Sequence, residues 1–340
     1  MTRALVVRLD SDGDVLLAGP AVRAVAAGSD AVTLLVSPTG EQAARLLPSV
    51  DEVVVWSCPW TGFDPPAVDA ASVHDLVARL TRGRYDVALV LTSYHQSPLP
   101  AALLLRLAGV ARIVASSVDY PGSLLDVRHP PVGPHEVERG LSLARAAGFS
   151  LATGDNDRLH VRQPLPPLPN VVESLGAYVV VHPSASVPAR APSPAQVRRL
   201  VQALVRSGRR VVVTGTAGDA DLVATVAVGE AGVVDLAGRT TFAELAGVLA
   251  GADCLVSGNT GPAHLAAAVG TPVVSLFAPV VAAEAWRPWG VPSVLLGDQH
   301  APCAGSRART CPVAGHPCLD GIEPAEVVAA VERLTALVAA

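Results

Sequence analysis

Residues 256–272 read Val256-Ser-Gly-Asn-Thr-Gly-Pro-Ala-His-Leu-Ala-Ala-Ala-Val-Gly-Thr-Pro272, which predicts a strand, a turn of small residues, a helix and a second strand. Pro262 suits the first helical position, so Gly261 is the expected capping residue. The backbone N–H groups of Ala263 and His264 are then expected to point out of the helix end, where a diphosphate binds well. The imidazole of His264 either adds a donor to that phosphate or packs in the core. A strand, turn and helix of this kind are typical of an α/β protein with a parallel sheet.

Strands and helices alternate in the same way along the rest of the chain, in two series. The expected strands of the first series lie at 4–8, 31–36, 52–55, 87–91 and 113–115, with helices at 15–26, 65–82 and 100–107. The expected strands of the second series lie at 178–181, 210–213, 233–236, 254–256 and 272–276, and a last helix covers 324–338. Two such series predict two doubly wound parallel sheets, with a ligand in the cleft between them beyond the carboxyl ends of the strands.

A proline-rich stretch, Gln163-Pro-Leu-Pro-Pro-Leu-Pro-Asn170, separates the two series because it can continue neither a helix nor a strand. We therefore expect a first domain over residues 1–165 and a second over 171–340, with the last helix free to pack back on the first domain. Two helix starts in the second domain, Ser193-Pro-Ala-Gln196 and Thr241-Phe-Ala-Glu244, have the spacing of a capping box.

The composition of the 340 residues excludes several classes of protein. Half of the residues are hydrophobic and 16% are charged, which argues against a disordered chain or a coiled coil. All 25 basic residues are Arg, so a Schiff-base lysine, a pyridoxal-phosphate lysine and a Walker A loop are excluded. The net charge of −5 and the scattered Arg residues argue against nucleic acid as a partner. We expect a cytoplasmic monomer with reduced cysteines and at most a transient contact with a membrane surface.

Three acids, Asp10, Asp12 and Asp14, lie in the turn after the first expected strand. Their spacing is that of an Asp-x-Asp metal site of a sugar-nucleotide enzyme. It equally suits helix capping, where carboxylates favour the positive N-terminus. A third interpretation makes Asp14, at the start of the helix, a general base that accepts the proton of a hydroxyl nucleophile. The residues alone leave these three interpretations open.

A polar turn, His182-Pro-Ser-Ala-Ser-Val-Pro-Ala-Arg190, follows the first strand of the second series. Ser184 and Ser186 are candidate hydrogen-bond donors to phosphate. Arg190 is a candidate to neutralise the negative charge that develops on a leaving group. The alternative is an ordinary polar turn with a surface Arg.

The order of these segments resembles glycosyltransferase family 9, the ADP-heptose heptosyltransferases of the GT-B fold. The most specific match is Thr260-Gly-Pro-Ala-His-Leu265. Further matching stretches are Gly13-Asp-Val-Leu16, His182-Pro-Ser-Ala-Ser186, Asp235-Leu-Ala-Gly-Arg-Thr240, Gly270-Thr-Pro-Val-Val-Ser-Leu-Phe-Ala-Pro279 and Trp286-Arg-Pro288. The resemblance covers essentially the whole chain. It implies two Rossmann-like domains that face a cleft, the first binding the acceptor and the second the nucleotide sugar.

The resemblance further implies an inverting, metal-independent glycosyltransferase that needs no cofactor. It moves a sugar, heptose in that family, from a nucleoside diphosphate such as ADP to a hydroxyl of a glycan or natural product. The catalytic Asp of the family falls on Asp14, its phosphate-binding basic residue near Arg190, and its ribose- or base-contacting acid near Asp219. Its diphosphate-binding turn falls on Thr260, Gly261 and His264.

Two positions depart from the family pattern. Asn259 stands where the family often has Asp, and an amide still hydrogen-bonds a sugar hydroxyl but cannot act as a base. Arg190 stands where the family commonly has Lys, which keeps the charge but changes its shape to a planar fork. Neither departure blocks the implied mechanism, and both leave the donor sugar open.

Contacts with the acceptor are expected from loops of the first domain, through His95, Gln96 and Asp126. The late loop with Cys303, Cys311 and Cys318 is interpreted as reduced rather than zinc-binding, because its cysteines lack the close spacing of structural zinc sites. Two other functions remain open. One is a sugar-nucleotide 2-epimerase of the same architecture, which needs no acceptor, and the other is a non-catalytic protein that binds a sugar nucleotide.

Overall fold

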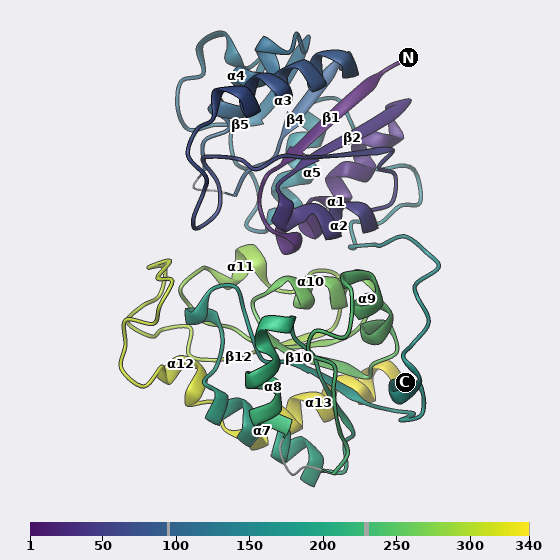
Figure 1. Cartoon of the computed structure of the whole chain (residues 1–340), viewed down its shortest axis with the longest axis vertical. Helices are drawn as coiled ribbons and strands as arrows, with labels where there is room; N and C mark the ends of the chain where they lie inside the picture. The colour runs from purple at the N-terminus through teal and green to yellow at the C-terminus, as the bar shows by residue number, and fades with distance from the viewer. Residues whose placement is uncertain (94–95, 228–230, 340) are drawn as a thin grey trace. The chain divides into compact units, whose positions relative to one another are not determined.

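The computed structural model describes residues 1–93, 96–227 and 231–339 (Figure 1). The chain divides into two compact units, unit 1 (Met1–Arg162) and unit 2 (Gln163–Ala340). The division falls at the first residue of the proline-rich stretch. Within the described ranges no helix combines the length and the apolar character that a membrane span requires.

Unit 1 is built on a six-stranded parallel sheet with the order β3-β2-β1-β4-β5-β6. Helix α1 packs beside α2 and α5, whereas α3 packs beside α4 (Figure 1). The strands are β1 (Arg3–Arg8), β2 (Ala31–Val36), β3 (Glu52–Val55), β4 (Val87–Val90), β5 (Arg112–Ser116) and β6 (Val127–His129). The helices are α1 (Asp12–Ala27), α2 (Glu41–Leu46), α3 (Ala70–Gly83), α4 (Leu99–Leu107) and α5 (Glu136–Ala146), with 3₁₀ turns η1 (Pro38–Gly40) and η2 (Gly122–Leu124).

Unit 2 has the same kind of sheet, with the order β12-β11-β10-β7-β8-β9. The last helix, α13, packs against α7 and strands β10 to β12 of its own unit. The strands are β7 (Val179–His182), β8 (Val211–Val213), β9 (Val233–Asp235), β10 (Cys254–Gly258), β11 (Val273–Leu276) and β12 (Ser293–Leu296). The helices are α6 (Asn170–Glu173), α7 (Pro194–Arg206), α8 (Ala220–Ala227), α9 (Phe242–Ala250), α10 (Gly261–Ala268), α11 (Ala283–Trp286), α12 (Pro317–Asp320) and α13 (Pro324–Ala339), with 3₁₀ turns η3 (Pro188–Arg190) and η4 (Ala217–Asp219).

The two sheets have equivalent strand orders. In each unit the first strand lies inside the sheet, between the second and the fourth strands of that unit. The predicted pair of doubly wound parallel sheets is therefore confirmed. This arrangement matters for function, because the chain leaves the first and fourth strands in opposite directions across the sheet and opens a ligand site at their carboxyl ends.

Two strands of the structure, β6 and β12, were not predicted from the sequence. Each lies at the edge of its sheet. All residues of β6, and all residues of β12 except Val294, are partly or fully exposed, so neither strand shows the continuous run of buried apolar residues of an inner parallel strand. The ten strands that were predicted include all the inner ones, because burial on both faces leaves a clear hydrophobic signal.

The two expected capping boxes differ in the structure. Thr241 and Glu244 form a reciprocal box at the start of α9. At the start of α7 the Ser193 hydroxyl accepts the Gln196 N–H at 3.2 Å, as predicted. The Gln196 side chain does not close the box, however, because it donates to the carbonyl of Ile322 at 2.6 Å. It thereby ties α7 to the chain just before α13.

Candidate active site

Asp14 lies in the first turn of α1, directly beyond the carboxyl end of β1. The Arg8 side chain, at the last position of β1, donates through Nη2 to Asp14 Oδ1 at 3.1 Å. The hydroxyl of Ser11, the residue before the helix, donates to Asp14 Oδ2 at 2.9 Å. Both carboxylate oxygens are therefore engaged, while 21% of the side chain stays exposed to solvent. This Asp is oriented and accessible.

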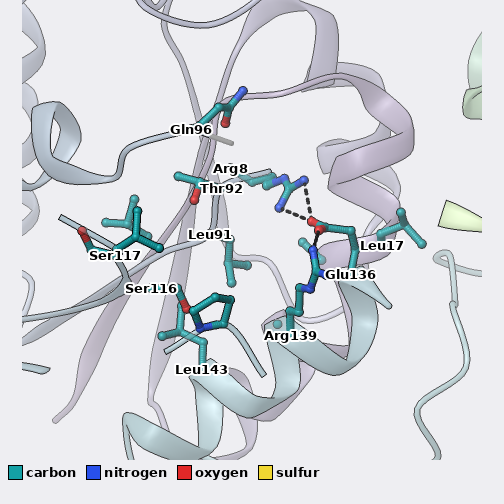
Figure 2. A pocket seen from close by; sticks show the side chains of 15 residues that line it. Arg8, Leu17, Leu91, Thr92, Gln96, Ser116, Ser117, Glu136, Arg139 and Leu143 are labelled. Atoms are coloured by element: carbon teal, nitrogen blue, oxygen red, sulfur yellow. Dashed lines mark hydrogen bonds and ion pairs between the residues drawn. The ribbon is translucent and has the colours of Figure 1, made fainter. Parts of the chain in front are cut away.

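Arg8 is itself held by groups from other parts of unit 1. Its two Nη atoms donate to Glu136 Oε2 at 3.3 and 3.2 Å, and Nη2 also donates to the Ser93 hydroxyl at 3.1 Å. Glu136 is the first residue of α5, and its second oxygen, Oε1, accepts from Arg139 at 3.1 Å. Figure 2 shows this chain of charges, with Glu136 between the two guanidinium groups. Side chains from β1, from the segment after β4 and from the first turn of α5 thus meet at one end of the sheet.

Asp10 is the third acid around Arg8. Its Oδ2 lies 2.9 Å from Arg8 Nε, but the N–H is not aligned on the oxygen, so the contact is an ion pair without a hydrogen bond. Gln96 donates to Asp10 Oδ1 at 2.6 Å. Burial raises the pKa of Asp10 to about 6, although the charge of Arg8 acts in the other direction. Burial alone would lower the pKa of Arg8, but Asp10, Asp14 and Glu136 outweigh it and raise that pKa.

Asp12 points elsewhere, so the three acids of the first turn do not converge. Its Oδ1 accepts the backbone N–H of Ala43 at 2.8 Å, and it therefore caps the first turn of α2 rather than of its own helix. Burial raises the pKa of Asp12 to about 6, against the effect of that hydrogen bond. In the ranges that the structure describes, no group of three or more His, Cys, Asp or Glu side chains is arranged to hold a metal ion.

A pocket of about 670 Å³, counting its open side, lies beside Arg8 in unit 1. Gln96, the first of the expected acceptor-side residues, is among the residues that line it (Figure 2). Its wall combines apolar and polar side chains: Arg8, Leu17, Ala18, Val90, Leu91, Thr92, Gln96, Ser116, Ser117, Val118, Pro131, Glu136, Arg139, Gly140 and Leu143. His95, the second expected acceptor-side residue, lies outside the described residues.

Asp126, the third expected acceptor-side residue, is not brought to this end of the sheet. It accepts the backbone N–H of Ile113 at 2.6 Å and pairs with Arg106 at 2.5 Å, at the start of β5. The physical reason is the topology. Because β5 and β6 are parallel, the loop between them has to return to the amino edge before β6 begins. Asp126 lies at the end of this loop, where its carboxylate binds the backbone of β5.

In unit 2, His182 ends the first strand, β7, beside Ser257 of β10. Its Nδ1 lies 3.0 Å from the Thr214 hydroxyl, and its Nε2 lies 3.4 Å from the Ser184 hydroxyl. Burial lowers the pKa of His182 to about 4, with the charge of Asp219 acting in the other direction. The imidazole is therefore neutral at pH 7, and it connects two hydroxyl groups. Ser186, further along the same turn, is exposed.

Asp219, the expected ribose- or base-contacting acid, makes local hydrogen bonds in the structure. Its Oδ2 accepts both the backbone N–H and the hydroxyl of Thr216 at 2.7 Å, which closes a capping box around η4. Burial would raise the pKa of Asp219, but the hydrogen bonds from Thr216 lower it. The carboxylate is thus ionised and held next to the turn that carries Ser184 and His182.

The start of α10 differs in detail from the expectation. Thr260, not Gly261, is the N-cap residue, and Pro262 occupies the second helical position. The N–H of Ala263 does not point out of the helix, because it donates to the carbonyl of Thr260 at 3.0 Å. Asn259 and His264 are 6% and 3% exposed, so both side chains face the interior of unit 2. The expected cradle of free N–H groups is accordingly smaller than predicted.

Arg190 and the turn after β10 are brought together. Arg190 ends the 3₁₀ turn η3, and its backbone carbonyl lies against Gly258, where a Cβ atom would overlap the carbonyl oxygen. Only a glycine permits this close approach. The two segments that the sequence singled out in unit 2 are therefore neighbours in space.

The cysteines of the late loop lie in unit 2. Cys303 and Cys318 are buried in the core of unit 2, and all five cysteines of the chain are free. Burial, together with a smaller effect of neighbouring Cys303 and Cys311, raises the pKa of Cys318 to about 11. The Cys318 thiol is therefore protonated at neutral pH.

Several residues of the unit 1 site were not singled out in the sequence. Arg8 carried a usable signal, because it is a charge at the end of an apolar strand and directly precedes three acids. Glu136, Arg139 and Ser93 carried none, since they lie 85 or more positions from Arg8 in the sequence.

Comparisons with known proteins agree with this architecture. The family model described as glycosyltransferase family 9 (heptosyltransferase) matches residues 73–316. Lipopolysaccharide heptosyltransferase 3 of Escherichia coli (strain K12) is 31% identical over 167 residues, which are 47% of this chain and 48% of that protein. The chain thus spans about half the length of the curated relatives it matches.

Solved structures show the likeness of fold. The E. coli ADP-heptose lps heptosyltransferase II has a TM-score of 0.74 and 20% identity, with all of both chains covered. A glycosyl transferase family 9 protein from Veillonella parvula has a TM-score of 0.77 and 15% identity, over 99% of this chain and 97% of that chain. At these identities the likeness establishes the fold, and residue roles have to come from the geometry above.

Proposed function

Since the chain belongs to glycosyltransferase family 9, the heptosyltransferase family, we propose that it transfers a sugar from a nucleoside diphosphate to a hydroxyl group. The acceptor is a glycan or a small natural product. ADP-heptose is the first donor to test, because the solved neighbour from E. coli is named an ADP-heptose heptosyltransferase. Unit 1 supplies the group that accepts the proton, and unit 2 binds the donor.

The observation that carries this proposal is the state of Asp14. A carboxylate that is oriented through both oxygens, lies beside a guanidinium and remains open to solvent has the properties of a general base. In the proposed step it accepts the proton of the acceptor hydroxyl while that oxygen bonds to the anomeric carbon of the donor. The bond from the anomeric carbon to the diphosphate oxygen breaks, and its electron pair leaves with the diphosphate.

Unit 2 stabilises the departing diphosphate in this proposal. Arg190 supplies a positive charge, and the start of α10 adds the partial positive charge of a helix N-terminus. Ser184 and Ser186 offer hydroxyl donors on the adjacent turn. Such groups lower the barrier because they interact more strongly with the charge that develops in the transition state than with the ground state.

A single displacement inverts the anomeric centre, and we propose that no metal takes part. The three acids after β1 are the group that an Asp-x-Asp metal site would use. Instead, Asp10 and Asp14 both contact Arg8, and Asp12 caps α2. The guanidinium of Arg8 thus supplies the positive charge beside Asp10 and Asp14.

The test is the release of ADP from ADP-heptose in the presence of a panel of methyl glycosides as acceptors. We expect Asp14→Asn to lower acceptor-dependent release by about a thousandfold, the middle of the usual range for a general base. The matched control is Asp12→Asn, two residues away, which keeps an acceptor for the Ala43 N–H and leaves release near the wild-type rate. Equal losses in both variants, or turnover retained by Asp14→Asn, would remove Asp14 from this role.

Two further readouts sharpen the proposal. Proton NMR of the product reports the anomeric configuration, and retention would contradict a single displacement.

A thermal-shift panel of ADP-, GDP- and UDP-linked sugars identifies the donor, because a ligand that binds only the folded state raises the melting temperature. Incubation with donor alone separates transfer from the epimerase alternative, since an epimerase changes the sugar without any acceptor.

A further inference from the structure

Arg8 sits in a cluster whose composition is unusual for a protein interior. The side chains of Arg8, Asp10 and Glu136 are 5%, 9% and 4% exposed. One guanidinium therefore faces three carboxylates, those of Asp10, Asp14 and Glu136, with a second guanidinium, Arg139, on the far side of Glu136. The neighbouring polar groups are the Ser93 hydroxyl and the Gln96 amide.

Stability alone does not account for such a cluster. Removing charges from water is costly, and well-packed apolar residues of the same volume usually stabilise a core as well as a buried ion pair does. The same unit contains a cluster of the ordinary kind. Arg23 binds Asp155 through two hydrogen bonds, at 2.9 and 3.0 Å, and donates to two backbone carbonyls, so one cation faces one anion. Around Arg8 the carboxylates are in excess, and one of them is Asp14.

We propose that Arg8 is a positioning residue for Asp14, and that Glu136 holds Arg8 in place for this task. This inference rests on the proposed role of Asp14 as the base. Arg8 fixes one carboxylate oxygen of Asp14 while Ser11 fixes the other, so the carboxylate has one orientation. The positive charge also favours the ionised form of Asp14, which is the form that can accept a proton.

The position of the cluster connects it with the acceptor. Arg8 and Glu136 both line the pocket of unit 1, and Figure 2 shows Arg8 between Glu136 and Gln96. Arg8 thus has one side toward the pocket and donates to Asp14 as well. An alcohol bound in the pocket therefore lies near the residue that sets the orientation of the base.

The test is the pH dependence of acceptor-dependent ADP release from ADP-heptose. Activity requires ionised Asp14, so it falls as the pH drops, and this fall is the acid limb of the profile. Arg8→Met removes the charge that favours the ionised form. We expect the acid limb to move up by about one pH unit. We expect kcat at the plateau to drop about a hundredfold through misplacement of the base, with KM for the donor within about twofold because the donor lies in unit 2.

Arg8→Lys keeps the positive charge but loses the planar guanidinium group with its several N–H donors. It should leave the acid limb near the wild-type position while the plateau kcat stays low, since an ammonium cannot hold Asp14, Glu136 and Ser93 together. The matched control is Arg23→Met, another buried and ion-paired Arg of unit 1. It should lower the melting temperature and leave both the limb and kcat unchanged. An acid limb of Arg8→Met that coincides with the wild type, or an equal shift in Arg23→Met, overturns the inference.

If Arg8→Met fails to fold, Glu136→Gln provides the opposite test. It removes one negative charge from the surroundings of Arg8, which leaves more of the guanidinium charge to Asp14. The acid limb should move to lower pH, and a limb that stays or moves to higher pH contradicts the inference. Failure here is distinct from failure of the proposed function. If Asp14→Asn is inactive and the Arg8 variants leave the limb unmoved, only the role of Arg8 is lost.

Discussion

The two units carry the same strand order but opposite kinds of chemistry at the end of their first strand. In unit 1 that strand ends in Arg8, which is surrounded by three carboxylates. In unit 2 it ends in His182, which is neutral at pH 7 and contacts two hydroxyl groups. Equivalent positions in the two sheets thus carry different chemistry, because the residue that ends the first strand and the side chains around it differ between the units. Under the proposed function, the charged cluster of unit 1 handles the proton, and the hydrogen-bonding groups of unit 2 bind the diphosphate.

The largest loss of activity that this comparison predicts for unit 2 is expected at Arg190. We expect Arg190→Ala to lower kcat/KM for the donor between about a hundred and a thousandfold, as loss of one group that stabilises transition-state charge usually does. Arg206→Ala, an exposed Arg at the end of α7 in the same unit, is the matched control and should stay within about twofold of wild type. Steady-state kinetics of ADP release measures both, and a mild Arg190 variant would show that the leaving group is stabilised elsewhere.

The two sites should also respond to pH with opposite signs. The pKa of Asp10 is raised by burial to about 6 from 3.8, so its contribution to stability is present below pH 3.8 and is lost as the pH rises through 6. The pKa of His182 is lowered by burial to about 4 from 6.5, so its contribution is present above pH 6.5 and is lost as the pH falls through 4. Each contribution amounts to about 3 kcal/mol.

Denaturant unfolding of Asp10→Asn and His182→Asn beside the wild type, from pH 4 to 7, measures these contributions. Toward low pH the wild type should gain stability relative to Asp10→Asn and lose stability relative to His182→Asn. Slopes of the same sign would contradict the assignment of a charged cluster to unit 1 and a neutral one to unit 2.

A smaller effect is expected at Gly258. A Cβ atom there overlaps the Arg190 carbonyl oxygen, so Gly258→Ala has to displace the turn that carries Arg190. We expect donor affinity to weaken about tenfold, because a displaced donor group loses part of its contact with the diphosphate. Gly218→Ala is the control, since a Cβ at Gly218 meets only the Thr216 hydroxyl at 3.5 Å, an ordinary contact. Calorimetric titration with ADP distinguishes the two, and equal affinities would mean that Arg190 is not held by this approach.

The smallest effect is expected at Asp126. Asp126→Asn should leave transfer within about twofold of wild type and lower stability by about 1 kcal/mol, the usual contribution of a hydrogen bond. A large loss of transfer with unchanged stability would place Asp126 at the acceptor after all, in spite of its location at the amino edge of the sheet.

The contrast between these residues also shows how far the sequence reaches. The inner strands follow from continuous apolar runs, and the Thr241 cap follows from its partner three residues away, because both signals are local. The edge strands β6 and β12 are short and half-exposed, so they lack such a signal. The position of Asp126 at the amino edge of the sheet depends on the topology, which the local sequence does not reveal. The capping role of Asp12 toward α2 depends on a partner 31 residues away.

The sequence also singled out part of the candidate site. Asp14, Arg190 and the turn around Thr260 stand out through their positions after strands, where the doubly wound fold concentrates function. Arg8 is recognisable in the sequence as a charged residue at the end of an apolar strand. Its proposed role, however, depends on Glu136, which lies 128 residues further along the chain. Contacts of that kind become visible only when the chain is folded.

The division of work between the units is tested most directly by calorimetric titration of ADP into the wild type, Asp14→Asn and Arg190→Ala. Asp14→Asn should bind ADP within about twofold of the wild type, because unit 1 acts on the acceptor, whereas Arg190→Ala should bind at least about tenfold more weakly. If Asp14→Asn weakens ADP binding as much as Arg190→Ala does, or if Arg190→Ala binds ADP like the wild type, then the donor is not held by unit 2 in the way described.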